Sequence, residues 1–154
     1  MLNIVFHEPE IPPNTGNAMR LAAVTGSRLH LIRPLGFEMD DARLRRAGMD
    51  YRDRATVEVH DDVASWLGSK APGRVIAFTV DAETRYDRIT YVAGDSLLFG
   101  RESVGLSQEI KSAAWVDVTA RIPMVPDVRS INVANAAAIV VYEAWRQLDF
   151  AGSS

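Results

Sequence analysis

The sequence of 154 residues contains no cysteine. That absence excludes a disulfide scaffold, a thiolate nucleophile, a zinc finger and an iron–sulfur site, and it favours the reducing environment of the cytoplasm. No apolar stretch approaches the roughly 20 residues that cross a bilayer, and no basic segment precedes a long apolar one at the N-terminus. We therefore expect a cytoplasmic protein that neither enters a membrane nor is secreted.

Motifs of several common enzyme classes are missing or incomplete. There is no P-loop and no G-x-G-x-x-G sequence after the first expected strand, which removes the usual sign of an NTPase or a dinucleotide enzyme. The segment Gly100–Gly105 resembles a nucleophile elbow but lacks the G-x-S-x-G spacing of a serine hydrolase. His7, His30 and His60 are scattered without helical pairing, so each is expected to be a surface or capping residue rather than a metal ligand.

Lysine is scarce, since 15 of the 17 basic residues are arginine. Arginine favours forked contacts to phosphate, although a high arginine content can equally reflect genomic base composition. Five arginines fall within twelve residues that hold only two acidic side chains, on a chain of net charge -3: Arg43, Arg45, Arg46, Arg52 and Arg54. This cluster is either a nucleic-acid contact or an ordinary solvated helix face.

The apolar pattern predicts one α/β domain over residues 1–154, with a mostly parallel sheet flanked by helices. With 47% apolar residues, the chain can bury a core without a disulfide or metal. The expected strands are residues 2–6, 29–32, 57–59, 75–79, 96–99 and 116–122, and the expected helices are residues 18–24, 42–47, 61–67, 107–113 and 132–148. Asn14 and Thr15 are expected to cap the first helix, and Gly26 to end it.

The last expected helix has an apolar surface wider than one face. A stripe with helical spacing is widened by four further residues: Val133, Ala137, Val140, Ala144 and Leu148, then Ala136, Ile139, Val141 and Trp145. A helix that is apolar on more than one side needs a second partner, either the rest of its own domain or a second copy of the chain. We predict a homodimer.

Three segments follow expected strands, at the edge where ligands of open α/β sheets gather. They run from Glu8 to Arg20, from Leu97 to Leu106 and from Ile122 to Ala136. Prolines stiffen the first, Gly100 lets the backbone of the second approach a ligand, and the third is a restrained loop with backbone donors and acceptors. Taken singly, each is also explained by helix caps and strand-to-helix turns.

Taken together, the three segments resemble the signature motifs of the SPOUT, or trefoil-knot, RNA methyltransferases. The matching residues are Asn14-Thr15-Gly16-Asn17 with Arg20, Phe99-Gly100-x-Glu102-x-x-Gly105, and Ile122-Pro123-Met124 through Arg129-Ser130-x-Asn132 to Tyr142-Glu143. The resemblance covers essentially the whole chain. Without an added RNA-binding domain, the chain is similar to the smallest members of the family, which methylate the ribose of the wobble nucleotide, cytidine or uridine, in leucine tRNAs.

The resemblance implies a topology that ordinary rules do not predict. In this family the C-terminal half, here approximately residues 75–150, is threaded into a trefoil knot whose loops bind S-adenosylmethionine, whereas knots are almost absent from other proteins. By the same resemblance, the protein is an S-adenosylmethionine-dependent tRNA 2′-O-ribose methyltransferase. It is expected to need no metal and no other protein partner, and to share its active site between the two copies of a homodimer.

The resemblance also assigns roles to individual residues. The cofactor is expected at Phe78, Thr79, Gly100, Ile122, Pro123, Met124 and Ser130. Arg20 is the expected catalytic residue, oriented together with the ribose by Asn14, Glu102, Ser130 and Asn132. A guanidinium stays protonated in proteins and has no acceptor, so Arg20 fits the stabilisation of negative charge on oxygen better than the general-base role of the family. RNA contacts are expected at Arg20, Arg43, Arg45, Arg46 and Arg129.

Three other functions remain open at this point. They are a methyltransferase of the same fold acting on ribosomal RNA or another tRNA position, a non-catalytic RNA-binding dimer, and a flavodoxin-like small-molecule binder. The intact set of Asn14, Arg20, Glu102 and Ser130 argues against the non-catalytic dimer. A bound flavin would give the purified protein visible absorbance.

Overall fold

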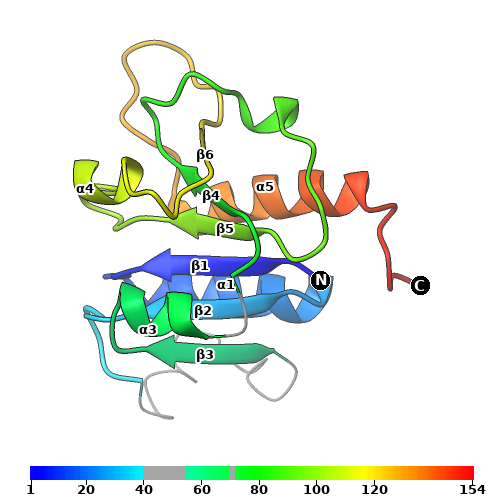
Figure 1. The fold of residues 1–154 in the computed structure, drawn as a ribbon, viewed down its shortest axis with the longest axis horizontal. Helices are drawn as coiled ribbons and strands as arrows, with labels where there is room; N and C mark the ends of the chain where they lie inside the picture. The colour runs from blue at the N-terminus through cyan, green and yellow to red at the C-terminus, as the bar shows by residue number, and fades with distance from the viewer. Residues whose placement is uncertain (40–54, 70–71) are drawn as a thin grey trace.

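The computed structural model describes residues 1–39, 55–69 and 72–154. Within them, six strands form one sheet in the order β3-β2-β1-β5-β4-β6, and every neighbouring pair is parallel (Figure 1). The strands are β1 (Asn3–His7), β2 (Arg28–Ile32), β3 (Thr56–His60), β4 (Val75–Phe78), β5 (Ser96–Phe99) and β6 (Val118–Ala120). The predicted α/β class and parallel sheet are confirmed.

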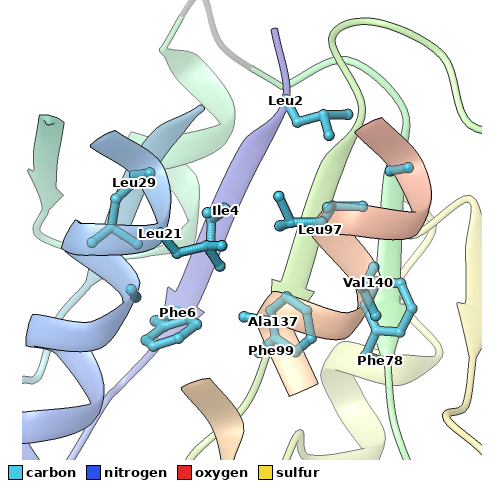
Figure 2. Packing of buried hydrophobic residues seen from close by; sticks show 14 of the residues in the cluster. Leu2, Ile4, Phe6, Leu21, Leu29, Phe78, Leu97, Phe99, Ala137 and Val140 are labelled. Carbon is cyan, nitrogen blue, oxygen red and sulfur yellow. The ribbon is translucent and has the colours of Figure 1, made fainter. Parts of the chain in front are cut away.

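Helices cover both faces of the sheet. They are α1 (Pro12–Thr25), α3 (Val63–Gly68), α4 (Gln108–Lys111) and α5 (Val133–Gln147), with a 3-10 turn η1 (Tyr86–Arg88). α1 and α5 pack on one face, where Ile4 and Leu97 meet Ala137 and Val140 (Figure 2). Val5 points to the other face and packs with α3 and α4. The expected helix 42–47 lies outside the described residues.

The interior strands β4 and β5 are buried along their whole length. Because their apolar residues are continuous and do not alternate with polar ones, both faces of these strands must be covered, as in parallel sheets between two layers of helices. Phe78 and Phe99, at the carboxyl ends of these strands, stack with ring centroids 5.0 Å apart (Figure 2). This aromatic pair lies beside the edge that carries the three motifs.

The start of α1 differs from the prediction. The helix begins at Pro12, and its N-cap residue Ile11 makes no side-chain capping bond, so Asn14 and Thr15 lie in the first turn instead of before it. Prolines suit this place because the first helical N–H groups have no partner within the helix. The other end agrees with the prediction, since Gly26 ends α1 in the left-handed conformation with φ of 67°.

β6 (Val118–Ala120) is shorter than the expected strand 116–122 at both ends, and just beyond it the N–H of Arg121 bonds to the carbonyl of Thr84 at 2.8 Å. The domain itself covers more of α5 than the single predicted stripe, because Val141, outside that stripe, is fully buried. Ile139 and Tyr142 remain exposed. The homodimer and the trefoil knot stay predictions. In the described ranges, no helix has the length and apolarity that crossing a membrane requires.

Candidate active site

The three segments singled out in the sequence meet at one cavity. They follow β1, β5 and β6, whose carboxyl ends lie at the same edge of the parallel sheet (Figure 1). The cavity there has a volume of about 830 Å³, and its wall combines residues of all three segments with the end of β4. This is the place where open α/β sheets bind their ligands.

Most residues predicted to hold a cofactor lie on this wall: Phe78, Thr79, Gly100, Ile122, Met124 and Ser130. Pro123 is not among the described residues that line it. Asn14, Glu102 and Asn132, predicted to orient the reaction, lie on the same wall. The structure therefore brings together residues that are more than 100 positions apart in the sequence.

Glu102 supplies the cap that α1 lacks. Its carboxylate accepts hydrogen bonds from the N–H of Glu10 at 2.8 Å and of Ile11 at 3.1 Å. No acidic residue stands in the first turn of α1, so Glu102 also provides the negative charge that stabilises the positive end of a helix. The second motif thereby fixes the start of the helix that carries the first.

Asn14 extends this contact to the third motif. Its Nδ2 donates to Glu102 at 3.1 Å, and its Oδ1 accepts from Nδ2 of Asn132 at 2.9 Å. Asn132 in turn caps α5, because its Oδ1 accepts from the N–H of Ala134 at 2.9 Å and of Asn135 at 3.2 Å. The line Glu102–Asn14–Asn132 ties the N-termini of α1 and α5 together, and its polar atoms bond to the protein itself.

The backbone of the same segment packs so closely on Gly100 that this position has no room for a side chain. A Cβ at this position would lie 2.3 Å from the carbonyl carbon of Gly105 and 2.4 Å from the nitrogen of Leu106. Gly105 itself has a φ of 69°, which a side chain would oppose. The interpretation of Gly100 as room for a ligand is thus incomplete: the glycine lets the second motif fold back on itself beside the cavity.

Among the charged residues of the wall, the two that lie outside the three segments, Asp81 and Lys111, were missed by the sequence reasoning. Lys111 donates to the Asp81 carboxylate at 2.6 Å, and Thr79 donates to the same carboxylate. These hydrogen bonds, from Lys111 first and Thr79 second, lower the pKa of Asp81. The available signal was position, since Asp81 closely follows the end of β4.

The predicted arginines are placed differently from one another. Arg129 lies on the cavity wall and is exposed. Arg20 is exposed on α1 and is not among the described residues that line the cavity. Arg43, Arg45 and Arg46 lie outside the described residues. Asn14, Glu102 and Asn132 bond to one another, and the expectation that they orient Arg20 and the ribose stays a prediction.

A parallel sheet with helices on both faces and these three motifs around one cavity at its carboxyl edge defines a methyltransferase of the SPOUT type. The model of the SpoU rRNA Methylase family matches residues 1–142, and the chain belongs to this family.

Similar proteins agree with this assignment. A tRNA (cytidine(34)-2′-O)-methyltransferase of Aeromonas hydrophila is 53% identical over 153 residues, which cover 99% of this chain and 98% of that protein. A solved structure from work on the 2-OH methylation of C/U34 on tRNA has a TM-score of 0.89 at 43% identity and covers 97% of both chains. The SpoU methyltransferase AviRb of Streptomyces viridochromogenes, in complex with AdoMet, has a TM-score of 0.81 at 25% identity, covering 97% of this chain and 61% of that one.

Proposed function

We propose that the protein uses S-adenosylmethionine to methylate the ribose 2′-hydroxyl of the wobble nucleotide, C or U, in leucine tRNAs. The observation that carries the proposal is the junction of the three motifs at one cavity through Glu102, Asn14 and Asn132. The similarity to a tRNA methyltransferase over nearly the whole of both chains supports tRNA as the substrate. A tRNA substrate also agrees with the predicted cytoplasmic location.

The cavity wall fits S-adenosylmethionine by its chemistry. Phe78, Ile122 and Met124 offer apolar surface for a purine ring, and the backbone around Gly100 and Ser130 offers donors and acceptors. When bound, the cofactor supplies a methyl group on a sulfonium, which is a good leaving group without help from the protein. The chain's own tasks are then to align the ribose oxygen with that methyl group and to manage the hydroxyl proton.

Glu102, Asn14 and Asn132 act in this proposal as positioning residues. Their polar atoms bond to one another and to the ends of α1 and α5, so they fix the cavity's shape instead of exchanging protons. The charge that develops on the 2′-oxygen still needs a cation. Arg20 is the residue assigned to that role, as a donor to the oxygen rather than as a base.

Arg20 is proposed to act on the cavity of a second copy of the chain. It is exposed on α1, which packs against α5, and both helices expose apolar side chains, Val24 on α1 and Ile139 and Tyr142 on α5. A second copy covering these side chains would form the predicted homodimer. Arg20 would then be supplied by one copy and the cavity by the other.

Mixed dimers separate a shared site from a site within one chain. Arg20→Ala removes the cation, and Ser130→Trp fills the cavity from an exposed loop position. Each variant alone should be inactive and, by light scattering, still dimeric. Co-expressed, they should regain about a quarter of the wild-type activity, because half of the dimers are mixed and each mixed dimer has one intact site. No recovery in mixed dimers would place Arg20 and the cavity of the same chain together.

The substrate class is tested by methyl transfer from labelled S-adenosylmethionine to bulk tRNA and, separately, to ribosomal RNA, both from cells that lack this gene. Nucleoside analysis of the product should find the label in 2′-O-methylcytidine or 2′-O-methyluridine of leucine tRNA. Label in ribosomal RNA or another tRNA would support methyl transfer to RNA but contradict the proposed substrate. No label in either RNA would contradict the proposed activity.

A further inference from the structure

Two histidines and a glutamate meet on the sheet far from the cavity, in strands β2 and β3. His30 lies opposite Glu58 in the parallel register, and His60 lies two residues further along β3, so the three side chains share the face covered by α3 and α4. Nδ1 of His30 is 3.0 Å from Nε2 of His60 and 3.9 Å from Oε2 of Glu58. Contrary to the expectation of surface or capping residues, His30 is fully buried and His60 is 8% exposed.

The neighbouring strand determines which nitrogen of His30 carries its hydrogen. Nδ2 of Asn3 donates to the carbonyl of Gly94 at 3.1 Å, which leaves Oδ1 of Asn3 as an acceptor for Nε2–H of His30 at 3.3 Å. Nδ1 of His30 therefore presents a lone pair to His60 and Glu58. A second hydrogen bond that fixes the tautomer in this way is the usual environment of a metal-binding histidine.

We propose that His30, Glu58 and His60 bind one divalent transition-metal ion of the zinc class. The three ligand atoms lie within 4.8 Å of one another, and two imidazoles with one carboxylate are ligands that zinc accepts. Zinc–nitrogen bonds of about 2.0–2.1 Å in tetrahedral geometry place two nitrogens about 3.3 Å apart, near the observed 3.0 Å. The Glu58 side chain is 40% exposed, so it can move toward the ion and leaves a path for its entry.

Binding requires only small changes at these groups. Without an ion, the short contact between the rings is a hydrogen bond from Nε2–H of His60 to Nδ1 of His30. With the ion, this hydrogen moves to Nδ1 of His60, so both rings stay neutral and both ligand nitrogens are bare. Arg28, earlier in β2, carries the nearby positive charge that opposes the ion, while the carboxylate of Glu58 offsets it.

The ion would join the edge strand to the rest of the sheet. β3 is at the end of the strand order and pairs with β2. Because His30 belongs to β2 while Glu58 and His60 belong to β3, one ion would bridge these two strands. Binding to the folded state alone must then raise the melting temperature with the concentration of free ion.

The test uses the whole chain, freed of metal with a chelator and then titrated with Zn²⁺ and separately with Co²⁺. Calorimetry should give one Zn²⁺ per chain, and Co²⁺ should give the visible absorption of a four-coordinate site. Zn²⁺ should also raise the melting temperature. The absence of saturable binding would overturn the proposal.

Three variants locate the ion. Glu58→Gln keeps the shape of a half-exposed side chain and should weaken binding at least about tenfold, and His60→Gln should weaken it about a hundredfold. His7→Gln, which changes the remaining histidine, should bind as the wild type does. Circular dichroism establishes that each variant is folded. Equal binding in the wild type and in Glu58→Gln and His60→Gln, or loss with His7→Gln, would contradict the assigned site.

Discussion

The carboxylate of Glu102 contacts a part of the chain about 90 residues away in sequence. It accepts hydrogen bonds from two backbone N–H groups before α1 and from the side chain of Asn14. Its negative charge therefore lies at the start of a helix whose N-cap residue makes no side-chain capping bond. Bonds from backbone N–H groups to a charged acceptor are among the stronger hydrogen bonds in proteins. Glu102 therefore contributes to stability as well as to the shape of the cavity.

Glu102→Gln is expected to lower the free energy of unfolding by about 1–2 kcal/mol, because the neutral amide accepts weaker hydrogen bonds and loses the favourable charge at the helix start. Urea-induced unfolding measures this change. Glu83→Gln, at an exposed position, removes the same charge and should stay within about 0.5 kcal/mol of the wild type. Equal losses in the two variants would contradict the capping role.

Burial lowers the pKa of His30 from 6.5 to about 4; the charges of His60 and Arg28 act in the same direction, and Glu58 opposes them. Between these two pH values the unfolded chain binds more protons at this site than the folded chain does. The stability that His30 contributes as a neutral ring is thus present above its unfolded pKa of 6.5 and is lost as the pH falls to about 4.

The pH dependence of unfolding tests this account. In the presence of a chelator, the wild type should lose on the order of 3 kcal/mol through His30 between about pH 6.5 and pH 4. His30→Gln cannot titrate and should show a flatter curve over the same range, whatever its stability at neutral pH. If the two curves have the same slope, His30 is not buried as a neutral ring.

At the scale of elements, the sequence predicted best where a residue's neighbours along the chain decide its structure. The continuous apolar runs of β4 and β5 and the Gly26 end of α1 follow from local rules, and the structure confirms them. The start of α1 was predicted six residues too late, although Pro12 and Pro13 are a local signal for it. Only the acceptor before the helix, Glu102, comes from a distant segment. The resemblance of the three motifs predicted many of the residues that line the cavity, although not Asp81 and Lys111, and it did not predict which of them bond to one another.

Replacing either of two glycines by alanine should change the free energy of unfolding, but in opposite directions. One glycine lies in the turn after β5 and the other at the end of α3. Gly100→Ala should lower the free energy of unfolding by about 1–3 kcal/mol, since its Cβ meets backbone that has to shift. Gly68→Ala, at the last residue of α3 with no atom within 4 Å of the added Cβ, should leave it unchanged or raise it by up to about 1 kcal/mol. Chemical denaturation of both variants measures the difference. A tolerated Gly100→Ala would contradict the tight turn.

At the scale of the whole molecule, the net charge of -3 gives no general attraction to RNA. The proposed function therefore needs a local positive surface, for which Arg43, Arg45, Arg46 and Arg129 are the candidates. Only Arg129 is among the described residues, where it lies exposed on the cavity wall. A phosphate-binding role makes these residues act mainly on affinity and its dependence on salt.

Arg45→Ala with Arg46→Ala should weaken tRNA binding and reduce the slope of log K against log salt by about 1.4–1.8, which corresponds to two phosphate contacts. Filter binding over a range of salt concentrations measures the slope. Arg85→Ala with Arg88→Ala removes two charges elsewhere and serves as the matched control. An unchanged slope in the first variant would assign its arginines to a solvated face.

In the proposed function, one particular ribose hydroxyl accepts the methyl group. This is tested most directly with a leucine tRNA that lacks only the 2′-hydroxyl of nucleotide 34, compared with the same tRNA carrying it. With labelled S-adenosylmethionine and the wild-type protein, we expect one methyl group per intact tRNA and none on the 2′-deoxy form. Equal transfer to both tRNAs would contradict it.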